Sequence, residues 1–181
     1  MRLKQSSNEV LLADEEIVRV GPTEIAAVQT ALAQSSRGRS RICAHRDNAD
    51  VLHEMIIVLS HATYIRPHKH LGKSESFHIV QGELDVLVFD EQGAIAAVVQ
   101  MGSYGSGRDF FYRLATPLFH TVIVRSETVI FHETTNGPFK REDTLFAPWS
   151  PPETEPVAVA DYVRRLKSTV ADFIAAAASK R

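Results

Sequence analysis

The sequence predicts a mainly β protein, either a closed barrel or a sandwich, with a helix at each end. Between residues 39 and 149, short apolar runs rich in β-branched and aromatic residues alternate with turn residues at near-regular spacing. Before this region, residues 1–38 carry a helical pattern, and after it residues 150–181 carry another. These three observations divide the chain into an N-terminal extension, a β domain and a C-terminal segment.

The N-terminal extension contains two short apolar runs and a helix. Residues 10–12 and 17–20 are candidates for short strands that add to a sheet edge or to a partner subunit. A helix is expected to begin near Gly21, because a proline and an acidic residue occupy its first turn. It is expected to end at residues 35–38, a polar stretch that closes with glycine.

The β domain contains eight apolar runs bounded by turn signals. Gly82 separates two of these runs as a hairpin, and residues 90–93 form a strong turn signal between the next two. The predicted strands cover residues 41–45, 51–59, 77–81, 84–89, 94–100, 110–114, 120–125 and 128–134.

The C-terminal segment is a proline-rich linker followed by an amphipathic helix. Its apolar residues recur at steps of four and three, which places them on one helix face. This face is expected to pack on the barrel or on a second subunit. The residues concerned are Val159, Val163, Leu166, Val170, Phe173 and Ala177.

Composition excludes several classes of protein. The net charge of the 181 residues is −2, so no basic field indicates a nucleic-acid or membrane partner. Cys43 is the one cysteine, which excludes an internal disulfide framework and fits a reducing cytoplasm. The N-terminus lacks the apolar run of a signal peptide, and no apolar segment is long enough to span a bilayer. We therefore expect a cytoplasmic protein.

Four residues have the chemistry of a metal site. His68 and His70 are two residues apart, so in an extended segment both point to one face. Glu75 follows after a short loop, and His120 is a further imidazole downstream. Imidazole and carboxylate groups together are ligands of divalent transition metals. The sequence predicts that these four side chains meet around one ion, whose identity (Zn, Fe, Ni or Mn) stays open.

Strand alternation indicates which neighbouring residues share a face with the proposed metal ligands. If Glu75 points inward at the start of its strand, Phe77 and Ile79 share its face and His78 points the other way. Arg66 and Tyr64 have the same parity as the two histidines that follow them. They are therefore the candidate substrate-binding residues, and the arginine could hold an anionic group.

These residues also resemble a known family. His68-x-His70, Glu75 and Gly82 resemble the first conserved motif of the cupins, and His120 stands at the place of the histidine in their second motif. The resemblance implies a cupin double-stranded β-helix (jelly-roll) barrel, flanked here by the N-terminal helix and the C-terminal amphipathic helix. It also implies that these histidines and the glutamate bind one metal ion.

A narrower resemblance is to the WbuC-type cupin metalloproteins, which are associated with bacterial surface-polysaccharide gene clusters. It extends over residues 22–149 and rests on segments 63–70, 82–90, 137–139 and 146–149. The resemblance implies a fold and a metal. The association of these proteins with polysaccharide gene clusters favours a carbohydrate-related role. It does not supply a reaction.

Three functions are compatible with such a site. The first is a metal-dependent enzyme with isomerase- or epimerase-like chemistry on a small polar molecule such as a sugar or sugar derivative. The second is an iron-dependent, dioxygenase-type oxidoreductase. The third is a non-catalytic protein in which the metal stabilises the barrel or holds a small ligand. Cupin barrels commonly pair and the terminal helices carry apolar faces, so we expect a homodimer.

Overall fold

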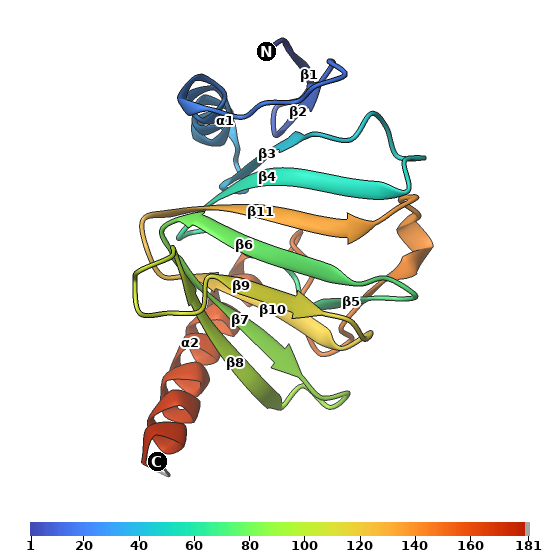
Figure 1. Ribbon diagram of the computed structural model, residues 1–181. Helices are drawn as coiled ribbons and strands as arrows, with labels where there is room; N and C mark the ends of the chain where they lie inside the picture. Colours follow the sequence, from blue (N-terminus) through green and yellow to red (C-terminus); the bar gives the residue numbers. More distant parts are fainter. Residues whose placement is uncertain (180–181) are drawn as a thin grey trace.

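The computed structural model describes residues 1–179, so the last two residues of the predicted C-terminal segment lie outside the described part (Figure 1). The elements in chain order are β1 (Leu3–Ser7), β2 (Val10–Ala13), α1 (Pro22–Gln34), β3 (Arg39–Cys43), β4 (Leu52–Ser60), β5 (His68–His70), β6 (Glu75–Gln81), β7 (Glu83–Phe89), β8 (Ile95–Gly102), β9 (Phe111–Leu114), β10 (Phe119–Val124), β11 (Thr128–Asn136), the 3-10 turn η1 (Arg141–Asp143), β12 (Thr144–Phe146) and α2 (Pro156–Ala178).

The strands form two sheets that face each other. A seven-stranded sheet has the order β1-β2-β3-β4-β11-β6-β9, and a five-stranded sheet has the order β12-β5-β10-β7-β8. From β6 onward the chain crosses repeatedly from one sheet to the other (Figure 1). This is the double-stranded β-helix of a cupin barrel, which confirms the predicted fold class.

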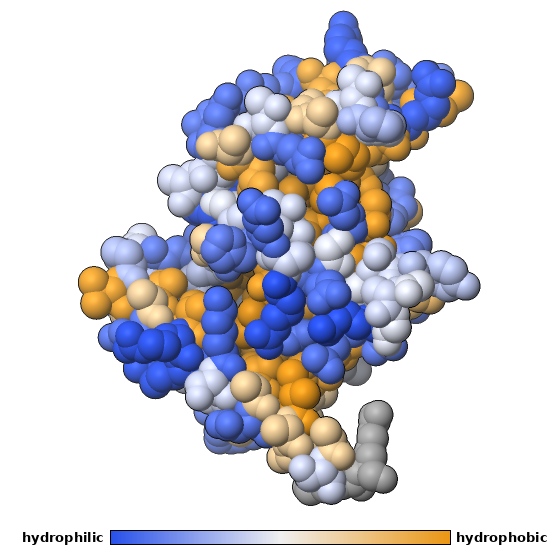
Figure 2. Space-filling view, turned by 90° about the vertical axis from the view of Figure 1, so that its left-hand side faces the viewer, coloured by the Kyte–Doolittle hydropathy of each residue, from blue (hydrophilic) through white to orange (hydrophobic). Residues whose placement is uncertain are grey.

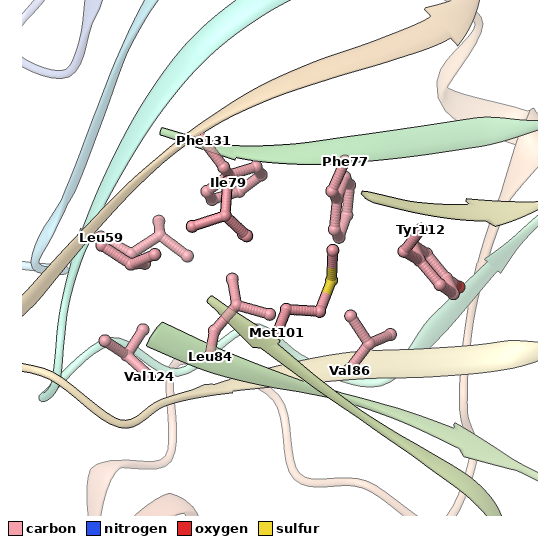
Figure 3. Packing of buried hydrophobic residues seen from close by; sticks show 10 residues of the cluster. Leu59, Phe77, Ile79, Leu84, Val86, Met101, Tyr112, Val124 and Phe131 are labelled. Carbon is pink, nitrogen blue, oxygen red and sulfur yellow. The ribbon is translucent and has the colours of Figure 1, made fainter. Parts of the chain in front are cut away.

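The hydrophobic core lies between the two sheets. Leu84 and Val86 of β7 face Phe77 and Ile79 of β6 across the barrel, and none of the four is more than 5% exposed (Figure 3). Burying one such side chain stabilises the fold by about 1.5–3 kcal/mol. Only glycine fits at Gly82 between these strands, because its φ is +81° and a Cβ atom would lie 2.4 Å from the Thr128 carbonyl oxygen.

The N-terminal segment extends the larger sheet. β2 pairs in parallel with β3, and α1 is the crossover between them, packed on the outer face of the sheet. As predicted, α1 begins after Gly21, whose backbone N–H donates to the Glu24 carboxylate at 2.9 Å. The expected strand at residues 17–20 is wrong. That segment is a loop that connects β2 to α1, and no strand of residues 1–179 pairs with it.

The C-terminal helix covers the outer face of the five-stranded sheet. Leu166 and Val170 of α2 pack with Phe89 and Phe119, and Trp149 lies in the same cluster. The predicted apolar face is thus used against the barrel of its own chain. Towards the C-terminal end of α2, hydrophobic residues reach the surface (Figure 2). None of the helices within residues 1–179 combines the length and apolarity needed to cross a bilayer.

Candidate metal centre

Three histidines from two strands of the five-stranded sheet converge on one point. His120 of β10 lies directly opposite His68 of β5, and His70 follows two residues later on β5. One ring nitrogen from each of the three lies within 4.8 Å of the others, a cluster that could hold a metal ion. The predicted alternation is confirmed for Lys69 between them, because its ammonium pairs with Glu91 at 2.7 Å and lies over the Phe119 ring.

Each imidazole is oriented through its Nδ1 atom. His68 Nδ1 lies 2.9 Å from the Arg66 carbonyl oxygen, and His120 Nδ1 lies 2.9 Å from the Leu118 carbonyl oxygen. A carbonyl only accepts, so both Nδ1 atoms carry a hydrogen and the metal-binding position left on each ring is Nε2. His70 Nδ1 lies 3.1 Å from the Thr144 hydroxyl. Such partners on the outer nitrogen are usual for histidines that bind metals.

Glu75 approaches the cluster from the opposite sheet. It is the first residue of β6, and one carboxylate oxygen lies 3.0 Å from His120 Nε2 and the other 3.7 Å from His70 Nε2. As predicted, Glu75 shares its buried face with Phe77 and Ile79. The structure therefore brings together all four residues that the sequence proposed as ligands.

Two atoms at this point have no hydrogen-bond partner in the described chain. His120 Nε2 and Glu75 Oε1 are both buried, and their 3.0 Å approach lacks the geometry of a hydrogen bond. Buried polar atoms without partners are costly and rare. A cation bound between the three imidazoles and the carboxylate would satisfy both atoms. The donor set fits a divalent transition metal such as zinc, iron, nickel or manganese.

The pKa values favour the neutral imidazoles of His68 and His70 beside an ionised Glu75 carboxylate. Burial, reinforced by the two neighbouring imidazoles, lowers the pKa of His68 to about 4, and burial also lowers that of His70. Burial would raise the pKa of Glu75, but His120 outweighs it and the pKa is lowered. Glu75 in turn outweighs the burial of His120, so the pKa of His120 is raised. A bound cation would therefore compete with a proton more strongly at His120 than at His68 or His70.

The centre lies on the wall of a cavity of about 690 Å³ between the sheets. Arg66 lines this cavity: its guanidinium donates to Ser150 and Ala147 oxygens and lies 5.0 Å from the centre of the Phe146 ring. Tyr64 is placed differently. Its hydroxyl donates to the Pro151 carbonyl oxygen at 2.9 Å, and it does not line the cavity.

Sequence reasoning missed a second carboxylate. Glu133 of β11 lines the cavity and sits opposite Phe77 of β6 in the sheet register. It is half-buried at the wall, and burial, with a contribution from Glu75, raises its pKa to about 8. A signal was present in the sequence, because Glu133 continues the inward row of Val129 and Phe131 at a spacing of two.

A family model and several solved structures are similar to parts of this chain. Residues 22–101 match a family model described as a domain of unknown function, DUF6016. No curated protein matches this sequence. Among solved structures, protein SO0799 from Shewanella oneidensis is similar with a TM-score of 0.50, at 11% identity over 62% of this chain and 75% of that one.

Two further structures are more distant. The cupin domain of Cnp3 from Schizosaccharomyces pombe has a TM-score of 0.42 at 15% identity, over 55% of this chain and 64% of that domain. Oxalate decarboxylase from Bacillus subtilis has a TM-score of 0.44 at 18% identity, over 54% of this chain. The match spans only 24% of the decarboxylase. The cupin fold of this chain follows from its own sheet order. The histidine cluster that it carries could bind a metal.

Proposed function

We propose that this chain is a metal-dependent enzyme that acts on a small polar molecule, such as a sugar or sugar derivative, by isomerase- or epimerase-like chemistry. One observation carries the proposal: three imidazoles each present a ring nitrogen to a single point on the wall of a cavity of about 690 Å³. Cavities of this size take small molecules.

Four side chains would bind the metal ion, and the partners of the histidine Nδ1 atoms would orient the imidazoles. His68, His70, His120 and Glu75 would hold the ion, which when bound supplies a Lewis acid for a hydroxyl or carbonyl oxygen of the substrate. The anchored Nδ1 atoms keep the imidazoles in one orientation, so little reorganisation accompanies binding.

Proton transfer needs a further group in the same cavity. The carboxyl of Glu133, with its pKa near 8, holds a proton at neutral pH and exchanges it readily. Isomerisation and epimerisation both move a proton, and this group favours them over the dioxygenase alternative. Arg66 is the proposed contact for a polar or anionic substituent, since its guanidinium borders the cavity. For Tyr64 a substrate contact stays a prediction only.

The WbuC-type assignment, the carbohydrate-related role, the homodimer and the cytoplasmic location remain proposals. A protein of WbuC type would support the sugar class of substrate. Light scattering at two protein concentrations would test the dimer, and a monomer at both concentrations would exclude it.

The test of the function is metal content combined with turnover. Protein prepared without a polyhistidine tag should contain close to one equivalent of a transition metal. The His120→Ala variant should bind that metal more than about 100-fold more weakly, since loss of an outer partner alone costs 10- to 100-fold. The matched control is His132→Ala, which removes a histidine of β11 that pairs with Glu54 instead.

The metal-loaded protein is then screened for isomerisation of sugar phosphates and nucleotide sugars. Turnover by the wild type and the His132 variant, but not by the His120 variant, is the expected result. Bound iron with oxygen uptake on adding substrate would favour the dioxygenase. Tight metal binding without turnover on any candidate would leave the non-catalytic role.

A further inference from the structure

The cavity beside the histidine cluster is lined by five arginines and four glutamates, and not all of the arginines are paired with a carboxylate. Some of its arginines are neutralised by carboxylates. Arg39 Nη2 lies 2.9 Å from the Glu153 carboxylate, and Arg37 pairs with both Glu9 and Glu153. These four residues form a closed ion-pair network at the side of the cavity formed by the N-terminal strands.

Arg41 and Arg141 line the same cavity without such a partner. Within residues 1–179 neither guanidinium lies within 4.0 Å of a carboxylate, and Arg66 is held by neutral oxygens alone. Both Arg41 and Arg141 are exposed. Their charges are therefore available to a ligand that enters from solvent.

Strand parity explains why Arg41 faces the cavity. Its neighbours on β3, Ser40 and Ile42, point to the other side, where the Ser40 hydroxyl donates to the Val28 carbonyl oxygen of α1 at 2.8 Å. Arg41 must then project from the inner face of the sheet, on the side of the histidines.

Arg141 comes from a different element. It begins the turn η1 that leads into β12, three residues before Thr144, whose hydroxyl orients His70. The two cationic residues thus line one cavity from different elements, one from β3 and one from the turn that leads into β12.

The carboxylate of Glu133 interacts electrostatically with Arg41, but within residues 1–179 the two form no ion pair that would neutralise the arginine. Glu133 lies on β11, and β4 separates β11 from β3. Glu75 faces the imidazoles rather than either arginine. A bound divalent cation would add further positive charge to the same space.

We propose that Arg41 and Arg141 form an anion-binding subsite at the mouth of the cavity, so that the small molecule taken up beside the histidines carries a carboxylate or phosphate group. This rests on the proposed function for the identity of the site, and it narrows the substrate class from polar to anionic. A guanidinium fork matches both groups, since each offers two oxygens at its spacing.

The experiment measures binding of three probes that share one ring: glucose, glucuronate and glucose 6-phosphate. Each is titrated calorimetrically into zinc-loaded wild type and into the Arg41→Gln, Arg141→Gln and Arg165→Gln variants. Arg165 is the matched control, because it is an exposed arginine on α2 that lies outside the cavity. Arg41 and Arg141 are exposed, so their variants are expected to fold.

At least one anionic probe should bind the wild type roughly tenfold more tightly than glucose, the size expected for a hydrogen bond to a charged group. Arg41→Gln and Arg141→Gln should each remove most of that advantage, while Arg165→Gln keeps it. Which anion shows the larger advantage tells carboxylate from phosphate. Equal affinities for the three probes, no binding of either anion at millimolar concentration, or equal losses in all three variants would overturn the subsite.

Zinc titration of the same variants separates this proposal from the proposed function. Arginine-dependent anion binding by a protein that fails to bind zinc or to turn over substrate would retain the subsite and remove the enzyme. Normal zinc binding with equal affinity for the three probes would remove the anion-binding subsite and leave the proposed function in place.

Discussion

The two halves of the barrel interior use the same strands for different chemistry. On β6 the inward row runs from Glu75 to Phe77 and Ile79, and on β10 it runs from His120 to Val124. The ligands lie at one end of each row and the apolar core at the other. Position along the strand, rather than choice of strand, decides whether a side chain packs or could bind a metal. The two halves should therefore respond to mutation independently.

The largest effect is expected in the apolar half. Leu84 is completely buried in the cluster of Figure 3, so Leu84→Ala should lower the free energy of unfolding by about 2–5 kcal/mol through lost burial and a residual cavity. Urea unfolding of the metal-free protein measures this. Val80→Ala is the control, because Val80 lies on the outer face of β6 and is 54% exposed. Metal affinity of the folded Leu84→Ala variant should stay unchanged, and a parallel loss would show that the halves are coupled.

A smaller effect is expected from removing the hydroxyl group that orients His70, in the half of the barrel that contains the histidines. Thr144→Val leaves the Nδ1 atom of His70 without its hydroxyl partner, which should weaken metal binding roughly 10- to 100-fold. The free energy of unfolding should change little. The control is Thr134→Val, on the outer face of β11. Metal affinity equal in both variants would mean that His70 is positioned by packing alone.

The smallest effect is the response of the metal-free protein to acid. An unfolded histidine takes up a proton near pH 6.5, whereas His68 in the fold does so only near pH 4. Protons then bind preferentially to the unfolded chain, so the free energy of unfolding should fall as the pH drops from 6.5 to 4. The raised pKa of His120 has the opposite effect. Its contribution to the free energy of unfolding is complete below pH 6.5 and is lost as the pH rises through the pKa of His120 in the folded state.

Urea unfolding with a chelator at pH 7, 6 and 5 measures this dependence. His68→Gln should flatten it, whereas a glutamine in place of the exposed His61 should not. An unchanged slope in the His68 variant would place the acid-sensitive group elsewhere.

Much of this architecture could be predicted because strands have a period of two. Alternation placed Glu75 with Phe77 and placed His68 and His70 on one face. The predicted strands of the barrel lie within two residues of those observed. The approach of His120 to the other ligands came from the cupin resemblance, since no local pattern specifies which distant strands pair.

Other parts depend on tertiary placement. Arg41 and Arg141 look like ordinary surface arginines in the sequence, and only the closure of the barrel brings both to one cavity. Tyr64 shares the parity of His68, but the chain between them is not a strand, so alternation does not carry over. The apolar residues 17–20 are exposed or half-exposed because a crossover connection, rather than a sheet, contains them.

The pairing of β12 with β5 has a consequence for the order of assembly. His70 acquires its hydroxyl partner only when Thr144 docks beside it, and His68 lies opposite Phe146 on the same late strand. During synthesis, at about 5–20 residues per second, the first two histidines leave the ribosome seconds before that strand exists. A nascent chain that lacks β12 therefore presents the first two histidines of the candidate metal centre without their strand partner.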